Sequence, residues 1–429
     1  MPRTLADWLA YIELQHPRSI ALGLERVREV AARLQLQQPA PRVITVGGTN
    51  GKGSTVAFIE AIAAAGGWRV GSYTSPHLLA YNERVRIGGR EVGDPELVAA
   101  FEAVHGAAQR DGPIALTYFE YGTLAALWLF QRAGLDLAVL EVGLGGRLDA
   151  VNLVDADVAV ITTVDLDHQD WLGNEREAIG REKAGIARAW RPLVLGEDDP
   201  PASVLRHAYA IGAAAVRAGC DFFFEPLPED ERSGDAYWRW HEVGYAIDLP
   251  RPALAAPVQL RNAATAIAAL RALGEPLPEA ALAHGVATAQ LPGRLQRFPR
   301  DGVDIVVDVC HNPQAARELA AWLAAQPAAG RTVAVFAALG DKDVAGVAAA
   351  LAPWIDAWHL AGLDAGERGQ DVEALAARLH GGAAGEGTRH ADVAAALAAA
   401  RAGAAPGDRI VVLGSFHTAA AALQALAPA

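Results

Sequence analysis

The fold is decided by residues 43–66, which read VITVGGTNGKGSTVAFIEAIAAAG. A short β-branched run leads into a glycine-rich turn, and an Ala-rich segment of helical character follows. Glycines allow successive backbone N–H groups to point into one concavity, and the helix N-terminus adds its positive dipole. Lys52 supplies a point charge, and the hydroxyl of Ser54 or Thr55 is placed to reach a magnesium ion. The stretch therefore predicts a cradle for the phosphates of a nucleotide.

The spacing of this loop differs from the common phosphate-binding pattern GxxxxGK[ST] at two points. Gly53 separates Lys52 from the hydroxyl residue, and the leading Gly47 lies one place from its usual position. A plain Gly-rich turn between a strand and a helix is therefore the structural alternative.

Short β-branched runs alternate with longer Ala-, Leu-, Glu- and Arg-rich segments along most of the chain. Continuous apolar runs separated by helix-length segments are typical of parallel strands that are buried on both faces. We expect such strands at residues 42–46, 135–142, 157–164, 304–309, 331–337 and 409–414. The sequence thus predicts an α/β fold.

The pattern changes between residues 220 and 257, where aromatic residues alternate with charged ones, which predicts a small antiparallel sheet. A helix is expected at residues 260–273, and LPGR at residues 291–294 then interrupts the chain before strands and helices resume. We expect residues 1–290 to form a mostly parallel domain of the P-loop NTPase type, residues 291–299 a hinge, and residues 300–429 a smaller Rossmann-like α/β domain.

The composition excludes several classes of protein. The chain has 429 residues, of which 52% are hydrophobic and 20% charged, so a large core is available and disorder is not indicated. The 37 Lys and Arg residues are outnumbered by 50 Asp and Glu residues, which gives a net charge of −13. Binding to nucleic acid or to anionic membranes depends on an excess of basic residues, so we expect neither.

The cysteines and the two ends of the chain indicate a cytoplasmic protein, and we also expect it to be a monomer. Cys220 and Cys310 form no disulfide framework and no zinc spacing. The N-terminal segment has charged residues where a signal peptide would be apolar, so we expect no export. Residues 410–429 carry no formal charge but include several polar residues, and we interpret them as a buried strand and a helix instead of a membrane span.

Polar side chains follow two of the expected strands at the point where each strand ends. Glu141 ends one strand, and Asp165, Asp167 and His168 follow another. In open parallel sheets ligands bind at the carboxyl ends of the strands, so these groups should converge with the glycine loop on one crevice. Mg²⁺ prefers a few protein ligands together with phosphate oxygens and water. For His168 alone, the alternative is a surface loop with a local cap.

Three other features have structural interpretations. The run GLGGRLDA at residues 143–150 resembles a dinucleotide fingerprint, but Leu148 stands where the third glycine belongs. Cys310 and His311 are adjacent on an extended segment and point opposite ways, which favours a core Cys and a separately used His. No GxSxG motif is present, and the charged run at residues 229–232 is expected to be a solvated loop.

The C-terminal half repeats the pattern of polar residues at strand ends. These residues are Asp308, His311, Asp341, Lys342, Asp343, Ser415 and His417. A cleft between two such domains is a favoured site for a substrate that must meet a nucleotide.

The motifs, taken in order, resemble the bacterial dihydrofolate synthase/folylpolyglutamate synthase family of the Mur ligase superfamily. The matching segments are GGTNGKGST (47–55), SYTSPHL (72–78), ERVRIGG (83–89), LTYFEYGTLAALWLF (116–130), LEVGLGGRLDAVN (140–152), LDHQDWLG (166–173), IGREKAGI (179–186), RNAATAIAAL (261–270), LPGRLQ (291–296), DVCHNPQAA (308–316) and LGSFHT (413–418). Each segment is modest evidence, but their order and content together are highly specific.

The resemblance implies roles for individual residues. The ATP phosphates would be held by Thr49, Asn50, Gly51, Lys52, Gly53 and Ser54, and the nucleotide site would be completed by Asn262, Arg294 and Asp308. Magnesium would be bound by Ser75, Glu141 and His168. The pteridine or pteroate pocket would be lined by Thr117, Tyr118, Phe119, Glu120, Leu148, Asp149 and Ala150. His311 would help to orient the second substrate.

Lys183 matches a lysine that the family carries as a carbamate, an anionic ligand for a second Mg²⁺ ion. The structural alternative is an ordinary ion pair with Glu182 or Asp165. The sequence departs from the family at Ala21, where the bifunctional enzymes have an acidic residue near the pterin pocket, at Cys310, which replaces a common Ala, and in LGDKD, which lacks a His.

The resemblance implies an ATP-dependent amide ligase that adds L-glutamate to dihydropteroate and to reduced folates. The acceptor carboxylate would attack the γ-phosphate of ATP, and the amino group of glutamate would displace phosphate from the acyl phosphate. Lys52, the loop amides and Mg²⁺ would neutralise the transferring group. A cell-wall Mur ligase would share the glycine loop but not TYFEYG in this form. A regulatory nucleotide switch would require an NKxD segment, which the sequence lacks.

Overall fold

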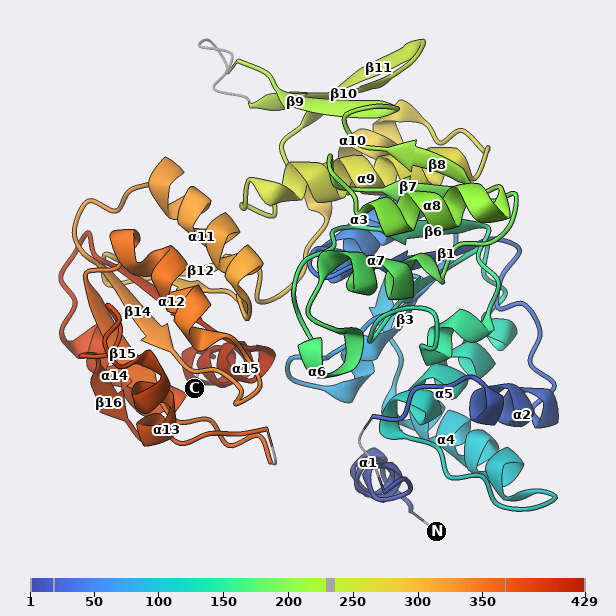
Figure 1. Ribbon diagram of the computed structural model, residues 1–429, viewed down its shortest axis with the longest axis horizontal. Coiled ribbons are helices and arrows are strands. Elements are labelled where there is room, and N and C mark those ends of the chain that lie inside the picture. The colour runs from blue at the N-terminus through green and yellow to red at the C-terminus, as the bar shows by residue number, and fades with distance from the viewer. Residues whose placement is uncertain (1, 18–19, 229–235, 367, 428–429) are drawn as a thin grey trace. The chain divides into compact units, whose positions relative to one another are not determined.

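The computed structural model describes residues 2–17, 20–228, 236–366 and 368–427 (Figure 1). The chain forms two compact units. The first comprises Met1–Ala253 and Gln259–Gln290, and the second comprises Leu254–Val258 and Leu291–Ala429. Each unit is built around a mostly parallel sheet, which confirms the predicted α/β fold.

The first unit contains an eight-stranded sheet with the order β4-β3-β2-β5-β1-β6-β7-β8. Its strands are β1 (Val43–Gly47), β2 (Val70–Tyr73), β3 (Val85–Ile87), β4 (Arg90–Glu91), β5 (Leu137–Glu141), β6 (Val158–Ile161), β7 (Pro192–Leu195) and β8 (Ala214–Arg217). The six strands β2, β5, β1, β6, β7 and β8 pair in parallel. Strand β3 pairs antiparallel with β2, and β4 pairs antiparallel with β3. Strand β1 is central and fully buried, so the loop that follows it leaves the middle of the sheet.

Helices pack against both faces of this sheet (Figure 1). They are α1 (Leu5–Glu13), α2 (Glu25–Arg33), α3 (Lys52–Ala65), α4 (Asp94–Gln109), α5 (Tyr118–Ala133), α6 (Gln169–Leu172), α7 (Arg176–Ala184), α8 (Ala202–Ile211), α9 (Val258–Ala272) and α10 (Glu279–Thr288), with short 3₁₀ turns η1 (Tyr81–Arg84) and η2 (Ala150–Leu153). One core cluster joins Trp8 of α1, Phe101 of α4 and Phe130 of α5 to the strand residues Val43 and Leu140. Val27 and Val30 of α2 belong to the same cluster, so α2 and α5 share one core with the sheet.

The predicted antiparallel sheet is confirmed. It consists of β9 (Phe222–Pro226), β10 (Tyr237–Glu242) and β11 (Tyr245–Pro250), in the order β11-β10-β9. Trp238 and Trp240 are fully buried, and the indole Nε1 of Trp240 donates to the carbonyl of Ala264 on α9 at 3.2 Å. The predicted charged loop at residues 229–232 lies outside the described residues.

The second unit has a six-stranded sheet with the order β12-β13-β17-β14-β15-β16, in which β12 alone of the described strands is antiparallel. Its elements are β12 (Gln296–Arg300), β13 (Val303–Val307), α11 (Pro313–Ala325), β14 (Thr332–Phe336), α12 (Val344–Leu351), η3 (Ala352–Trp354), β15 (Ala357–Ala361), α13 (Val372–Leu379), β16 (Thr388–His390), α14 (Val393–Ala402), β17 (Arg409–Leu413) and α15 (Phe416–Leu426). Cys310 lies in the core of this unit, as expected.

The uncharged stretch near the C-terminus forms strand β17 and helix α15, as predicted. Among the described residues, we find no helix with both the length and the apolar character needed to cross a membrane.

Candidate active site

The glycine loop between β1 and α3 has a backbone that only glycine fits at two positions. Gly48 has φ +145°, and a Cβ atom there would lie 1.9 Å from the Oγ1 of Thr162. Gly51 has φ +85°, and a Cβ atom there would lie 2.6 Å from the Oδ1 of Asn262. Glycine is required at both positions because side chains of neighbouring segments come close to the loop backbone. The loop thus brings Asn262, a predicted nucleotide-site residue of α9, against Gly51.

Hydrogen bonds fix the loop to the chain that follows β6. The amide of Thr49 donates to the carbonyl of Thr163 at 2.7 Å, and the amide of Asn50 donates to the Oγ1 of Thr163 at 3.1 Å. The hydroxyl of Thr49 accepts from the amide of Asp165 at 3.0 Å and donates to its carbonyl at 3.1 Å. The two segments therefore form one preorganised edge of the sheet.

Two lysines meet at the carbonyl of Gly48. The Nζ of Lys52 donates to it at 3.1 Å, and the Nζ of Lys183 on α7 donates to it at 2.8 Å. Lys183 is only 4% exposed, and burial, followed by the charge of Lys52, lowers its pKa to about 7. Two like charges at one carbonyl repel each other, so an anion bound here would stabilise the arrangement. The structure thus places Lys183 beside the glycine loop, a contact that the sequence did not predict.

The predicted metal ligands come partly together. Glu141 lies at the end of β5, paired in register with Val46 of β1, and is 4% exposed. Its Oε2 accepts from the amide of Ser75 at 3.0 Å, so these two residues are neighbours. His168 begins α6 with φ +51°, and its Nε2 lies 4.0 Å from the Oδ2 of Asp167.

Over the described parts of the chain, no three His, Cys, Asp or Glu side chains gather closely enough to hold a metal ion by themselves. The predicted set has two such residues and one serine hydroxyl. A cation here would therefore need phosphate or water oxygens as further ligands, which is the usual state of Mg²⁺ beside a nucleotide.

The two segments predicted to line an acceptor pocket also lie together, because η2, which begins at Ala150, packs against α5. Thr117 is the N-cap of α5: its amide donates to the Oε2 of Glu120 at 2.8 Å, and its hydroxyl accepts from the amide of Glu120 at 3.2 Å. A Cβ atom at Gly143 would lie 2.7 Å from the ring of Phe119, so the chain after β5 passes directly over that ring.

Asp149 holds the second of these segments in place. Its two carboxylate oxygens accept from the amides of Leu144 at 2.8 Å and Val151 at 3.0 Å. Burial raises the pKa of Asp149 to about 7, although these backbone hydrogen bonds oppose the rise. A carboxyl group with this pKa can both donate and accept hydrogen bonds near neutral pH.

Four acidic or hydroxyl residues that the sequence did not single out fix segments around the site. Glu197 after β7 accepts from the amide of Val164 at 3.0 Å, and burial raises its pKa to about 7. Glu83 accepts from three consecutive amides, those of residues 78–80, at 2.6–2.7 Å. Thr162 and Thr163 fix the glycine loop. Glu197, Thr162 and Thr163 act on residues that are distant in the sequence, so no local pattern predicts their contacts. Glu83, in contrast, accepts from amides only three to five residues before it.

The lysine content is a signal that could have pointed to the site. The chain has only three lysines, Lys52, Lys183 and Lys342, among 37 basic residues. Two of them meet at Gly48. Lysine differs from arginine in offering a compact charge whose pKa shifts readily on burial.

In the second unit, Asp308 after β13 is partly buried and links the strand end to neighbouring backbone. Its carboxylate accepts from the amides of Leu295 and Cys310, each at 2.9 Å, and burial raises its pKa. The guanidinium of Arg294 lies 5.2 Å from the centre of the Phe416 ring. The Nε2 of His311 lies 3.4 Å from the Nδ2 of Asn312.

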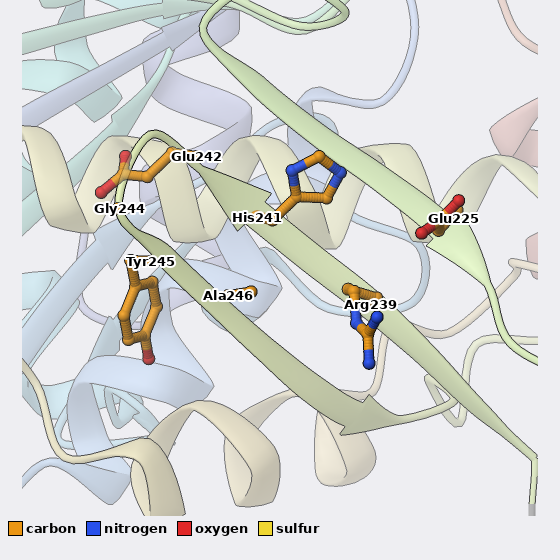
Figure 2. A pocket seen from close by; sticks show the side chains of 7 residues that line it. All are labelled: Glu225, Arg239, His241, Glu242, Gly244, Tyr245 and Ala246. Atoms are coloured by element: carbon orange, nitrogen blue, oxygen red, sulfur yellow. The ribbon is translucent and has the colours of Figure 1, made fainter.

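Figure 2 shows an open hollow on the strands of the antiparallel sheet. Its lining residues differ from those that the sequence predicted, and they are Glu225, Arg239, His241, Glu242, Gly244, Tyr245 and Ala246. Arg239 pairs with Asp248 at 2.6 Å, and His241 stacks on Phe223 with ring centres 5.0 Å apart. We interpret this hollow as ordinary paired sheet surface.

The fold and the site together define a phosphate-binding-loop protein with a second α/β unit. Residues 46–269 match the Mur ligase middle domain, and residues 293–416 match the glutamate ligase domain of Mur ligases. The chain is 47% identical to the dihydrofolate synthase/folylpolyglutamate synthase of Escherichia coli (strain K12), over 98% of this chain and 95% of that protein. The chain therefore belongs to the dihydrofolate synthase/folylpolyglutamate synthase family of Mur ligases, as its motifs predicted.

Solved structures agree. E. coli FolC in complex with DHPP and ADP is 46% identical and superposes with a TM-score of 0.91, covering 99% of this chain and 98% of that one. A bifunctional folylpolyglutamate synthase/dihydrofolate synthase with Mn, AMPPNP and L-glutamate bound is 45% identical, with a TM-score of 0.89 and coverage of 99% and 98%.

Proposed function

We infer that the chain is an ATP-dependent ligase that joins L-glutamate to dihydropteroate, giving dihydrofolate, and to reduced folates, giving folylpolyglutamates. The observation that carries this function is the glycine loop with two lysines at Gly48, in a chain that matches its relatives nearly end to end. Two similar structures hold a nucleotide, one with DHPP and the other with L-glutamate and Mn.

The reaction needs positioning and charge neutralisation more than a side-chain nucleophile. The acceptor carboxylate attacks the γ-phosphorus of ATP, which forms an acyl phosphate and releases ADP. The amino group of glutamate then attacks the acyl carbon, and inorganic phosphate leaves from the tetrahedral intermediate. Lys52 and the loop amides oppose the charge that spreads over the transferred oxygens.

We propose that Mg²⁺ is held by Ser75, Glu141 and His168. The residues fit this ion because Glu141 is a buried carboxylate next to Ser75 at the strand end that adjoins the glycine loop. When bound, the ion supplies further neutralisation of the phosphate oxygens.

We propose that Lys183 is carbamylated. The amine adds to carbon dioxide and loses a proton, which forms an N-carboxylate and turns a cation into an anion. A lysine with a pKa of about 7 is half unprotonated at neutral pH and is therefore reactive. The new carboxylate would serve as an oxygen ligand for a second Mg²⁺ ion and would end the repulsion between Lys183 and Lys52.

We assign the acceptor pocket to Thr117–Glu120 and to residues 148–150, because η2, which begins at Ala150, packs against α5, and Gly143 in the same connection lies against the ring of Phe119. Thr49–Ser54 and Asn262 are assigned to the nucleotide. The roles expected of Arg294, Asp308 and His311 rest on the family resemblance and stay predictions.

We further propose that the protein is a cytoplasmic monomer. We also propose that it binds neither nucleic acid nor membranes, because its net charge of −13 disfavours binding to polyanions. Light scattering after gel filtration tests the monomer.

The function is tested by following ADP release with a coupled assay. We expect ADP only when an acceptor, either dihydropteroate or tetrahydrofolate, and L-glutamate are both present. Running the two acceptors side by side shows whether the chain has both activities. ADP release that is indifferent to acceptor and glutamate would contradict the ligase.

A further inference from the structure

Arg26 on α2 connects two segments of the chain near the proposed acceptor pocket. Its Nη2 donates to the carbonyl of Ala21 at 2.8 Å and to the Oε1 of Glu120 at 2.8 Å. Its Nε donates to the same carboxylate at 3.2 Å. The guanidinium thus ties the loop before α2 to the first turn of α5 with a fork that lysine cannot reproduce.

The partner carboxylate already has a structural task. Glu120 is 4% exposed as a side chain, and its Oε2 accepts the amide of Thr117 to close the N-terminal turn of α5. Arg26 balances the charge of this buried carboxylate, and the Arg26 side chain is itself only 30% exposed. Without Arg26, Glu120 would keep a buried charge and would tend to turn toward water, which opens the turn that carries Thr117–Phe119.

The loop before α2 is also tied to the other proposed wall. The amide of Gly23 donates to the carbonyl of Leu148 at 3.3 Å, next to the buried Asp149. Gly23 has φ +147°, a backbone conformation that favours glycine. Residues 21–26 therefore bridge the two segments that meet at Phe119.

We propose that Arg26 is a positioning residue that sets the geometry of the acceptor pocket, and that the bridge formed by residues 21–26 determines affinity for the pteridine-bearing acceptor. This inference rests on the proposed function. The nucleotide loop is fixed by a different set of contacts, to Thr162, Thr163 and Asp165. Loss of Arg26 therefore affects the acceptor and largely spares ATP.

Helix α2 offers a matched control. Arg33 lies two turns further along the same helix, pairs with Glu29 at 3.0 Å, and donates to the carbonyls of Ala107 and Gly112. Arg33→Met removes the same atoms and the same charge from α2, but the contacts that it breaks are with the end of α4 and the loop after it.

The experiment compares the full chain with Arg26→Met, Arg26→Lys and Arg33→Met. For Arg26→Met we expect the KM for dihydropteroate to rise about tenfold or more, with the KM for ATP and kcat changed by less than about twofold to threefold. The KM of Arg26→Lys for dihydropteroate should lie between those of the wild type and Arg26→Met, because lysine keeps the charge but lacks the two-pronged guanidinium. Arg33→Met should leave both KM values within about twofold of the wild type.

A parallel rise of both KM values, an equal effect of Arg33→Met, or no change in Arg26→Met would each overturn the inference. If Arg26→Met does not fold, Arg26→Lys and Glu120→Gln are compared with the wild type instead, and the KM for dihydropteroate should again rise while the KM for ATP does not. Glu120→Gln keeps the size of the partner side chain but removes its charge. A wild-type chain that releases no ADP with dihydropteroate and glutamate overturns the proposed function, whereas an active wild type with an unaffected Arg26→Met overturns this inference alone.

Discussion

In both units polar residues follow parallel strands of the sheet, and they have two different roles: contact with the glycine loop in the first unit and helix capping in the second. In the first unit, Glu141 and Asp165 adjoin the glycine loop, and Lys183 reaches the same loop from α7. In the second unit, Asn312, Asp392 and Ser415 accept from backbone amides as N-caps of α11, α14 and α15.

The difference teaches how to interpret a polar residue after a buried strand. A helix that begins there leaves amides unpaired, and an Asn, Asp or Ser at that place satisfies one of them. A site is indicated where the strand enters a loop with glycines at positive φ and a buried charge from another element contacts that loop, as Lys183 of α7 contacts Gly48.

The strongest test of this comparison is Lys52→Ala in the first unit. We expect kcat to fall about 10³-fold or more, because the transferred phosphoryl group loses a fixed positive charge. The melting temperature should change little, since Lys52 is only partly buried. The control Arg69→Ala removes an exposed charge just beyond the other end of α3 and should keep full activity. An active Lys52→Ala would remove the loop from the mechanism.

Gly48→Ala tests whether the loop backbone itself is essential. The new Cβ atom would meet Thr162 at 1.9 Å in a backbone of φ +145°, so we expect a loss of about 2–4 kcal/mol in unfolding free energy and much weaker nucleotide binding. Gly67→Ala is the control, because its φ is +87° but its Cβ would have nothing within 4 Å. It should cost about 1 kcal/mol and leave nucleotide affinity unchanged. Equal effects of the two substitutions would contradict the close approach.

Lys183 predicts a particular dependence of stability on pH. Its pKa is about 7 in the folded chain and ordinarily 10.5, so between these values the unfolded chain binds the extra proton. Stability therefore rises with pH in this window, by about 2 kcal/mol from pH 7 to pH 9 for this group.

The measurement is urea unfolding at pH 7 and pH 9, without carbon dioxide, nucleotide or metal ions. In Lys183→Met, the free energy of unfolding should rise by about 2 kcal/mol less between pH 7 and pH 9. At pH 7 this variant should be more stable than the wild type. Identical pH dependence in the two proteins would show that Lys183 is not buried as a neutral amine. In activity assays, partial rescue of Lys183→Ala by a short carboxylic acid would support the carbamate, and failure of every small acid would count against it.

The smallest effect is expected in the second unit. Asp392→Ala removes the N-cap of α14, where the carboxylate accepts from the amide of Ala395 at 2.8 Å. We expect a loss of about 1 kcal/mol in unfolding free energy, with kcat/KM within about twofold of the wild type. A large loss of activity without a loss of stability would show that Asp392 acts in a site and not as a cap.

The sequence predicted the central strands because each is a continuous apolar run that is buried on both faces, as in β1 and β17. It did not predict β2, whose residues Val70–Tyr73 read VGSY, because Gly and Ser suggest a turn. Gly71 is needed there because a Cβ atom would meet Leu135 at 2.4 Å, which is a tertiary constraint. The exposed edge strands β4 and β16 likewise carry no apolar pattern.

For the site, sequence reasoning identified the glycine loop, because its signal is local and lies in consecutive residues. It did not identify Glu197 or Arg26, because each acts through a partner that only the folded chain brings near. It also did not identify Glu83, although the amides that Glu83 accepts from, those of residues 78–80, are close to it in the sequence. The strand-end pattern predicted Glu141 and His168 near a Mg²⁺ site, whereas the ligand role of Ser75 came from the family resemblance. The structure adds the contact between Ser75 and Glu141.

The central claim is that the chain activates a carboxylate by phosphorylation before glutamate adds. The direct measurement uses dihydropteroate labelled with oxygen-18 in its carboxylate, together with ATP and L-glutamate, and mass analysis of the phosphate released. An acyl phosphate transfers one labelled oxygen to phosphate in each turnover, and this is the result expected here. Phosphate without the label, formed while the glutamate adduct accumulates, would contradict the account.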